Sequence, residues 1–207
     1  MKIKTLLLIL ASGIVLTSCQ KEKDQQRGGE VNEKILGTWN FVGMSVNLTT
    51  SVTAGSGIDE ERGVSSYSFN STNNKGTVAI DAARFVTSAI SYSYNTKVYQ
   101  NIYLGGLLFN SSVTPMVGDM PQSHGEVEYK TLSQDTLHFE KGFAILEAPA
   151  SQGGPITQNT TPANIGISWA QDTLILTGHI VQAQNQIING FNARVTYNVL
   201  QVVKLKK

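Results

Sequence analysis

An alternation of apolar and polar residues with a period of two runs through much of this 207-residue chain. It is clearest near the C-terminus, where most even positions are polar and the odd positions, apart from Gln201, are apolar: Val195, Tyr197, Val199, Val203 and Leu205. A period of two with one polar face is the pattern of a half-buried β-strand. Clusters of turn residues separate such runs, so the sequence predicts antiparallel β-structure.

Turn residues between alternating runs predict three hairpins. They join residues 67–69 to 78–80, 127–129 to 137–139, and 165–169 to 174–176. An opening strand over 39–46 and a final strand over 193–205 bring the expected total to about eight strands.

Three other segments are less regular. Residues 81–90 fit either a helix capped by Asp81 or a bulged strand. Residues 110–125 and 148–164 exceed ordinary hairpin length and are expected to form two long loops.

The first 19 residues have the layout of an export signal. Lys2 and Lys4 precede an apolar run over 6–16, which is too short to span the ~30 Å hydrocarbon core as a helix. The run ends in Leu16-Thr17-Ser18-Cys19, which holds the only cysteine of the chain. This segment resembles the bacterial lipobox, and the alternative is an ordinary cleaved signal with a cysteine near the cut. The resemblance implies a signal peptide over 1–18 and acylation of Cys19, with palmitate-type chains that hold the protein on a membrane.

Residues 20–30 contain no apolar side chain, so a solvated tether is expected over 19–33, followed by one domain over 34–207. The charged run 21–24 resembles export signals of Bacteroidetes lipoproteins that reach the outer face of the outer membrane. A tether is often charged for solubility alone. The sequence therefore indicates an outer-membrane lipoprotein, on either the periplasmic face or the cell surface.

Composition disfavours several functional classes. Loss of Lys2 and Lys4 with the signal reduces the 16 basic residues to 14, against 15 acidic ones, for a net charge of −1. Such a chain has no positive field for nucleic acid. With Cys19 acylated, no thiol is left for disulfides, thiolate zinc sites or cysteine catalysis.

Catalytic patterns are also missing from the sequence. It has no Gly-x-Ser-x-Gly elbow and no Gly-rich phosphate loop. Among the three histidines, His124, His138 and His179, only His138 shares an expected strand face with a carboxylate, that of Glu140. A solvated outer face explains this pair better than a metal site or a proton relay. We expect no enzyme activity, no metal and no cofactor.

The stretch Ile35-Leu36-Gly37-Thr38-Trp39-Asn40-Phe41 resembles the Gly-x-Trp opening of the lipocalin and fatty-acid-binding (calycin) superfamily. It is closer still to the lipocalin-like domains that follow a lipobox in Bacteroidetes. The resemblance implies an up-and-down antiparallel barrel, with residues 32–36 as a closing turn and with Gly37 and Trp39 at its floor. A β-sandwich is the alternative fold.

In that family, an arginine of the last strand usually covers the floor tryptophan. Here that role is expected to fall to Arg194 or Lys204. The Thr-Asp-x-x motif of larger lipocalins is absent from this sequence, so the resemblance carries over no ligand-binding residues.

Four of the seven tyrosines lie between residues 92 and 103. Tyr92 and Tyr94 fall on one face of an expected strand, which makes them candidate contacts for a ligand. Ordinary sheet packing is the alternative. Separately, residues 135–137 and 172–174 resemble the Asp-Ser/Thr-apolar acceptor of Bacteroidetes O-glycosylation. A turn that leads into a strand is the simpler explanation of Asp135-Thr136 and Asp172-Thr173.

The sequence therefore favours a lipid-anchored binding module of the bacterial cell envelope, which takes a small apolar or amphipathic ligand or an envelope partner. The first alternative is a surface lipoprotein with a glycan-binding or adhesin-type β-sandwich. The second is an inhibitor of a hydrolase.

Overall fold

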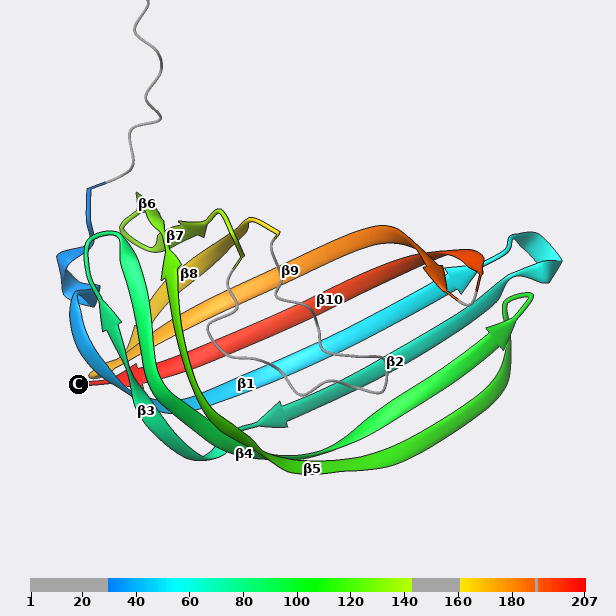
Figure 1. The fold of residues 1–207 in the computed structure, drawn as a ribbon, viewed down its shortest axis with the longest axis horizontal. Coiled ribbons are helices and arrows are strands. Elements are labelled where there is room, and N and C mark those ends of the chain that lie inside the picture. Colours follow the sequence, from blue (N-terminus) through cyan, green and yellow to red (C-terminus); the bar gives the residue numbers. More distant parts are fainter. Residues whose placement is uncertain (1–29, 143–160, 189) are drawn as a thin grey trace, which may run out of the picture.

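The computed structural model describes residues 30–142, 161–188 and 190–207 (Figure 1). The expectations for the signal peptide, for Cys19 and for most of the tether concern residues outside these ranges. The described chain forms one antiparallel sheet of ten strands and two short 3-10 turns. The prediction of an all-β antiparallel fold is therefore confirmed.

The strands differ greatly in length. The elements, in chain order, are η1 (Glu33–Ile35), β1 (Gly37–Ala54), η2 (Gly57–Asp59), β2 (Glu61–Asn70), β3 (Thr72–Ile80), β4 (Arg84–Leu104), β5 (Leu107–Glu128), β6 (Lys130–Ser133), β7 (Thr136–Phe139), β8 (Ala163–Ala170), β9 (Thr173–Ile188) and β10 (Phe191–Lys206). Six of them, β1, β2, β4, β5, β9 and β10, form a long curved half of the sheet, whereas β6, β7 and β8 gather at one end (Figure 1).

The sheet order is β2-β4-β3-β1-β10-β9-β8-β7-β6, with β5 on the free side of β4. Strands β2 and β3 lie end to end, because β1 pairs with β3 over Gly37–Asn40 and with β2 over Ser45–Ala54. The sheet thus ends in β5 on one side and β6 on the other. These two strands are consecutive in the chain and are joined by Tyr129 alone.

The predicted hairpin at residues 73–76 is wrong, because the chain does not reverse there. β2 and β3 run in the same direction along β1, and the turn residues instead produce bulges against β4. Asn73 and Gly76 have φ angles of 52° and 103°. A Cβ on Gly76 would lie 2.6 Å from the Ala89 carbonyl oxygen, so glycine permits a close approach between two strands instead of a reversal.

The other two predicted reversals are confirmed as the β6–β7 and β8–β9 hairpins. Residues 81–90 adopt the bulged-strand alternative: β4 begins at Arg84, its register shifts between Thr87 and Ile90, and Ala89 has a φ of 51°. Asp81 caps a tight turn, with its Oδ1 accepting hydrogen bonds from the backbone N–H groups of Ala83 and Arg84.

The predicted loop over residues 110–125 is also wrong, because this segment belongs to β5 and pairs with β4 along its length. Its Pro, Gly and Ser residues suggested a loop. The ladder of β4 nevertheless provides partners for its backbone, and most of its side chains remain exposed. Of the other predicted loop, residues 148–160 lie outside the described residues, while Ala163 and Asn164 already belong to β8.

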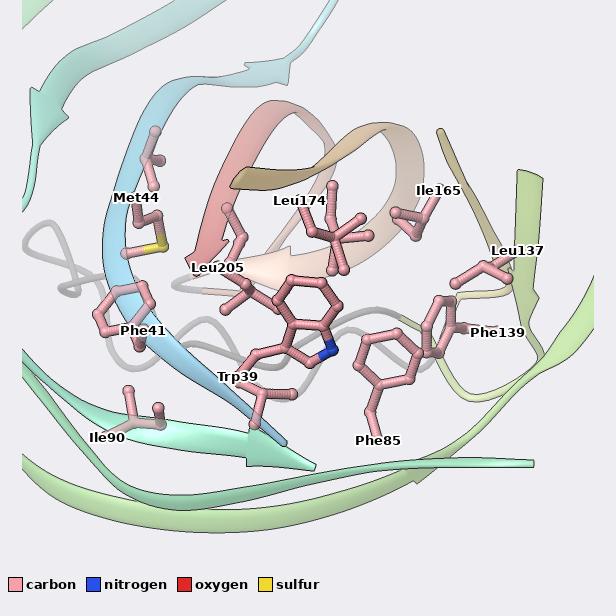
Figure 2. Packing of buried hydrophobic residues seen from close by; sticks show 14 of the residues in the cluster. Trp39, Phe41, Met44, Phe85, Ile90, Leu137, Phe139, Ile165, Leu174 and Leu205 are labelled. Carbon is pink, nitrogen blue, oxygen red and sulfur yellow. The ribbon is translucent and has the colours of Figure 1, made fainter. Parts of the chain in front are cut away.

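The apolar core fills the end of the sheet that β6, β7 and β8 close off (Figure 2). Trp39 lies in the middle of it, 2% exposed, near side chains from β4, β7, β8, β9 and β10. Along β1 the alternating burial ends at Leu48, and the residues beyond it are half-buried. The long strands therefore project past the core.

Trp39 makes a backbone hydrogen bond, a ring contact and a cation contact. Its Nε1 donates a hydrogen bond to the Ile35 carbonyl oxygen at 2.8 Å, and its ring centroid lies 5.8 Å from that of Trp169. The cation over the ring is Lys207, whose Nζ lies 4.7 Å from the ring centroid.

The expectation that Arg194 or Lys204 covers Trp39 is therefore wrong. Arg194 pairs with Thr53 near the other end of the sheet, and Lys204 pairs with Gly43. Both are even-numbered residues of a strand whose odd-numbered residues 193, 195, 203 and 205 are buried, so their side chains point outward.

Residues 32–36 form the expected turn beside this core. Asn32 Oδ1 accepts a hydrogen bond from the Lys34 backbone N–H at 3.1 Å, and Ile35 is completely buried. Asn32 Nδ2 donates to the Gln134 carbonyl oxygen, which links η1 to the β6–β7 turn. The start of the domain is thus tied to the far edge of the sheet.

Replacing Trp39 by alanine should lower the free energy of unfolding by about 3 to 5 kcal/mol, because it empties a large buried aromatic site. Trp169→Ala is the matched control, since this residue is 41% exposed, and it should cost clearly less. Urea denaturation followed by circular dichroism measures both. An unchanged denaturation midpoint for Trp39→Ala would place this residue outside the core.

Candidate functional site

Five aromatic side chains lie together on the core-facing side of the sheet, where the buried core ends. They come from β1, β2 and β4: Phe41, Tyr67, Phe69, Tyr92 and Tyr94. The rings of Phe69 and Tyr92 stack at 6.1 Å with an interplanar angle of 13°, and Phe41 meets Tyr92 edge-on at 6.3 Å. Such pairs stabilise the sheet beyond simple burial.

The two predicted contact residues differ in depth. Tyr92 is 3% exposed and lies within the core, as the sheet-packing alternative expects. Tyr94 is half-buried, and its ring centroid lies 5.8 Å from that of Phe69. A Cβ on the paired residue Gly118 would lie 2.6 Å from the Tyr94 hydroxyl oxygen, so glycine at position 118 leaves room for the tyrosine.

Tyr67 is uncharged in this aromatic cluster. Burial, and to a smaller extent the neighbouring Tyr94, raise the pKa of Tyr67 to about 12. The phenol therefore stays protonated over the whole physiological pH range.

Partly buried apolar side chains pack against the fully buried core. Four of them, from β5, β9 and β10, pack against the core while keeping some exposure: Met116, Met120, Ile180 and Val199. We call these four and Tyr94 the apolar rim. Two of its members are methionines, whose flexible thioether chains adapt to the shape of a bound group.

Farther from the core along the strands, the same face of the sheet becomes polar. Leu48 pairs with Val199, which pairs with Ile180. Two residues farther along each strand, Thr50 pairs with Tyr197, which pairs with Gln182. Residues paired across antiparallel strands point to the same face, and so do residues two apart along a strand. The core-facing side of the sheet therefore changes from buried aromatic through the apolar rim to hydroxyl and amide groups.

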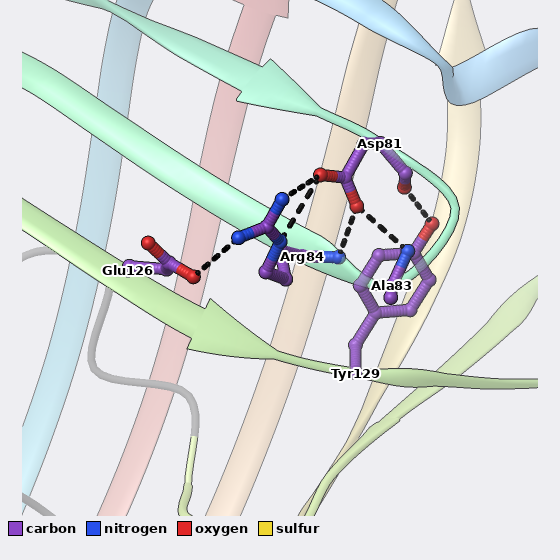
Figure 3. Close-up of polar contacts among 5 residues, drawn as sticks. All are labelled: Asp81, Ala83, Arg84, Glu126 and Tyr129. Carbon is purple, nitrogen blue, oxygen red and sulfur yellow. Dashed lines mark hydrogen bonds and ion pairs between the residues drawn. The ribbon is translucent and has the colours of Figure 1, made fainter.

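A second set of polar contacts lies at the C-terminal end of β5 (Figure 3). Arg84 bridges Asp81 at 3.1 Å and Glu126 at 3.0 Å, and the Tyr129 hydroxyl donates to the Asp81 carbonyl oxygen at 2.7 Å. Hydrogen bonds, first that of the Ala83 backbone N–H, lower the pKa of Asp81. These contacts join the β3–β4 turn to β5 and to Tyr129, which is a structural role.

His138 and Glu140 do lie near one another, with 3.6 Å between His138 Nε2 and Glu140 Oε1. Glu140 is paired more closely with Lys130, at 3.0 Å, and the hydrogen bond from Lys130 is the main cause of its lowered pKa. His138 Nδ1 contacts Asn164 Oδ1 at 2.7 Å. Lys130, His138 and Glu140 line a surface pocket of about 200 Å³ together with Arg84 and Tyr129. The closest ion pair within its lining is that of Lys130 and Glu140.

The remaining histidines lie on other strands. His124, on β5, accepts a hydrogen bond from the Ala89 backbone N–H at 3.3 Å, and His179, on β9, contacts Asn198 at 2.8 Å on the outer face. Within the ranges that the structure describes, no three His, Cys, Asp or Glu residues are arranged to hold a metal. The described residues also include no helix long and apolar enough to cross a membrane.

Both predicted glycosylation acceptors lie at turns that enter strands. The Thr136 hydroxyl donates to Asp135 Oδ1 at 3.2 Å, and Asp172 pairs with Lys206 at 3.1 Å. Such contacts are typical of a turn that leads into a strand. Glycosylation of Thr136 and Thr173 stays a prediction.

Sequence reasoning did not identify Met116, Met120 or Lys207 as candidates. The two methionines are four residues apart in one strand with Gly118 between them, a period-two signal that the expected loop concealed. Comparison of the chain with protein-family models, curated proteins and solved structures found no match.

Proposed function

We propose that this chain is a lipid-anchored binding module of the bacterial cell envelope, attached to the outer membrane through Cys19. In this proposal the domain is a lipocalin-like barrel, closed at the end that holds Trp39. It binds one small apolar or amphipathic molecule against the apolar rim, without chemical turnover.

The barrel interpretation rests on how the two ends of the sheet meet. β5 is paired with β4, Tyr129 donates its backbone N–H to the Ala83 carbonyl oxygen at 2.8 Å, and the next residues pair with β7. One continuous segment thus connects the two edges of the sheet. The closing turn η1, the buried Trp39 and the cation of Lys207 support the same interpretation.

The observation that supports a ligand site is the change from apolar to polar side chains along the core-facing side of the sheet. Half-buried methionine, tyrosine and branched aliphatic side chains provide contact area for an acyl chain or a ring system, and the adjacent rung of Thr50, Tyr197 and Gln182 offers hydrogen-bonding groups for a polar head. The glycan-binding alternative depended on an exposed Tyr92–Tyr94 platform. With Tyr92 3% exposed, that platform does not form.

Tyr94→Ala should weaken binding of a fluorescent long-chain fatty acid by roughly 5- to 30-fold, because the truncation removes about 1 to 2 kcal/mol of apolar contact. Tyr99→Ala is the matched control: it truncates the same residue type on the same strand, where the side chain is 51% exposed, and should leave affinity unchanged. Fluorescence titration measures both, with circular dichroism as the folding control. Equal affinity for folded Tyr94→Ala and wild type would move the site away from the apolar rim.

The anchor is tested separately. Cys19→Ser removes the thiol on which acylation depends, so the variant should remain an unprocessed or unlipidated precursor. Phase separation in a cloud-point detergent and intact-protein mass spectrometry should show the loss of acyl mass and of detergent partitioning. A variant that keeps the mass and partitioning of wild type would contradict the lipobox interpretation.

A further inference from the structure

The two long edges of the sheet differ in how they resist the addition of another strand. Strand β5 forms one edge and carries Pro115, Pro121 and the carboxylates of Asp119 and Glu126. Prolines and charges on an edge oppose pairing with a further strand. The β5 edge is therefore protected against pairing with a strand of another molecule.

The outer part of β9 forms the other edge. β8 pairs with β9 only as far as Gly178, so in the described part of the chain residues 179–188 have a ladder on the β10 side alone. The whole of β9, from Thr173 to Ile188, contains no proline and no Asp, Glu, Lys or Arg. None of the usual protecting residues is present on this edge.

The side chains of this edge favour a strand partner. On the outer face Val181 and Ile187 are 60% and 76% exposed, and on the core-facing side three half-buried glutamines follow at a period of two: Gln182, Gln184 and Gln186. Branched aliphatic side chains pair well across strands, and glutamine amides can hydrogen-bond to one another.

We propose that residues 181–187 of β9 pair antiparallel with the same residues of a second copy of this chain, about a two-fold axis at Gln184. In this register Val181 lies opposite Ile187 and Gln182 lies opposite Gln186. Gln184 lies opposite its own copy. Directly opposite residues point to the same face, so both exposed aliphatic side chains are covered on one side and the amides meet on the other.

The self-complementary sequence is the reason for choosing a second copy as the partner. A two-fold interface brings the same patch of both subunits together, and only a register with its centre on Gln184 pairs Val181 with Ile187. The β5 edge of another copy is a poor partner because of Pro115 and Pro121. A seven-residue strand pair is smaller than the ~1,600 Å² of a standard interface, so the dimer is reversible.

Disulfide trapping in whole cells that express the full chain tests this register. Cys19 is the only native cysteine, so the wild type shows whether it contributes any cross-link. With a mild oxidant, Gln184→Cys should give a dimer on a non-reducing gel. Two matched controls should stay monomeric: Asn198→Cys, on β10 with a strand on both sides, and Ser112→Cys, on the protected β5 edge.

Adding Val181→Lys to Gln184→Cys should lower the cross-linked fraction at least about tenfold, because a lysine replaces the side chain that faces Ile187. The double variant Gln182→Cys/Gln186→Cys provides a second test of the register. Its two thiols are four residues apart in one strand, too far for an internal disulfide, and they meet the opposite pair of a second copy.

A cross-linked dimer from this double variant, with monomers from each single variant, supports the register even if Gln184→Cys fails to fold. Three results would overturn the proposal. They are a monomeric, folded Gln184→Cys protein, cross-linking through Ser112→Cys with equal yield, and a cross-linked fraction that Val181→Lys leaves unchanged.

Discussion

The packing of three aromatic rings holds the two ends of this sheet together. Phe85 lies 5.1 Å from Tyr129 and 5.4 Å from Phe139 between ring centroids, and Tyr129 and Phe139 are 6.0 Å apart. Phe85 belongs to β4 and Phe139 to β7, while Tyr129 connects β5 to β6. A chain that passes from one edge to the other through one residue needs that residue fixed by packing and hydrogen bonds. Tyr129 has both.

This packing lies in one of two unlike halves of the molecule. Near Tyr129 the sheet curls around a core that needs only short strands from β6, β7 and β8 to cover Trp39. Farther away, the long strands extend beyond that cover, and their core-facing side chains become half-buried and then polar. Apolar surface that the fold itself does not bury collects at the border between the halves. That is where we place the ligand, because a bound apolar group there completes the burial.

The sequence predicted strand pattern well and long-range pairing poorly. Period-two alternation identified β10 nearly to its ends because a half-buried strand imposes that pattern directly, whereas the predicted strands over 39–46 and 174–176 cover only parts of β1 and β9. The turn residues at 73–76 and at 133–135 look alike locally, yet only the second set reverses the chain. The first lies opposite β4, where the strand continues through a bulge, and the Asn74 side chain donates a hydrogen bond to the Val42 carbonyl oxygen of β1. Alternation also placed Tyr92 and Tyr94 on one face. Alternation could not predict how deeply either side chain is buried, because burial depends on which strands lie beside β4.

Native mass spectrometry of the protein released in mild detergent from its own membrane tests the central claim most directly. The account predicts one small apolar or amphipathic molecule per chain, observed in addition to the mass of the acylated N-terminus and displaced by an added long-chain fatty acid. A chain that carries its acyl groups and no further molecule, and that takes up no fatty acid when challenged, would contradict it.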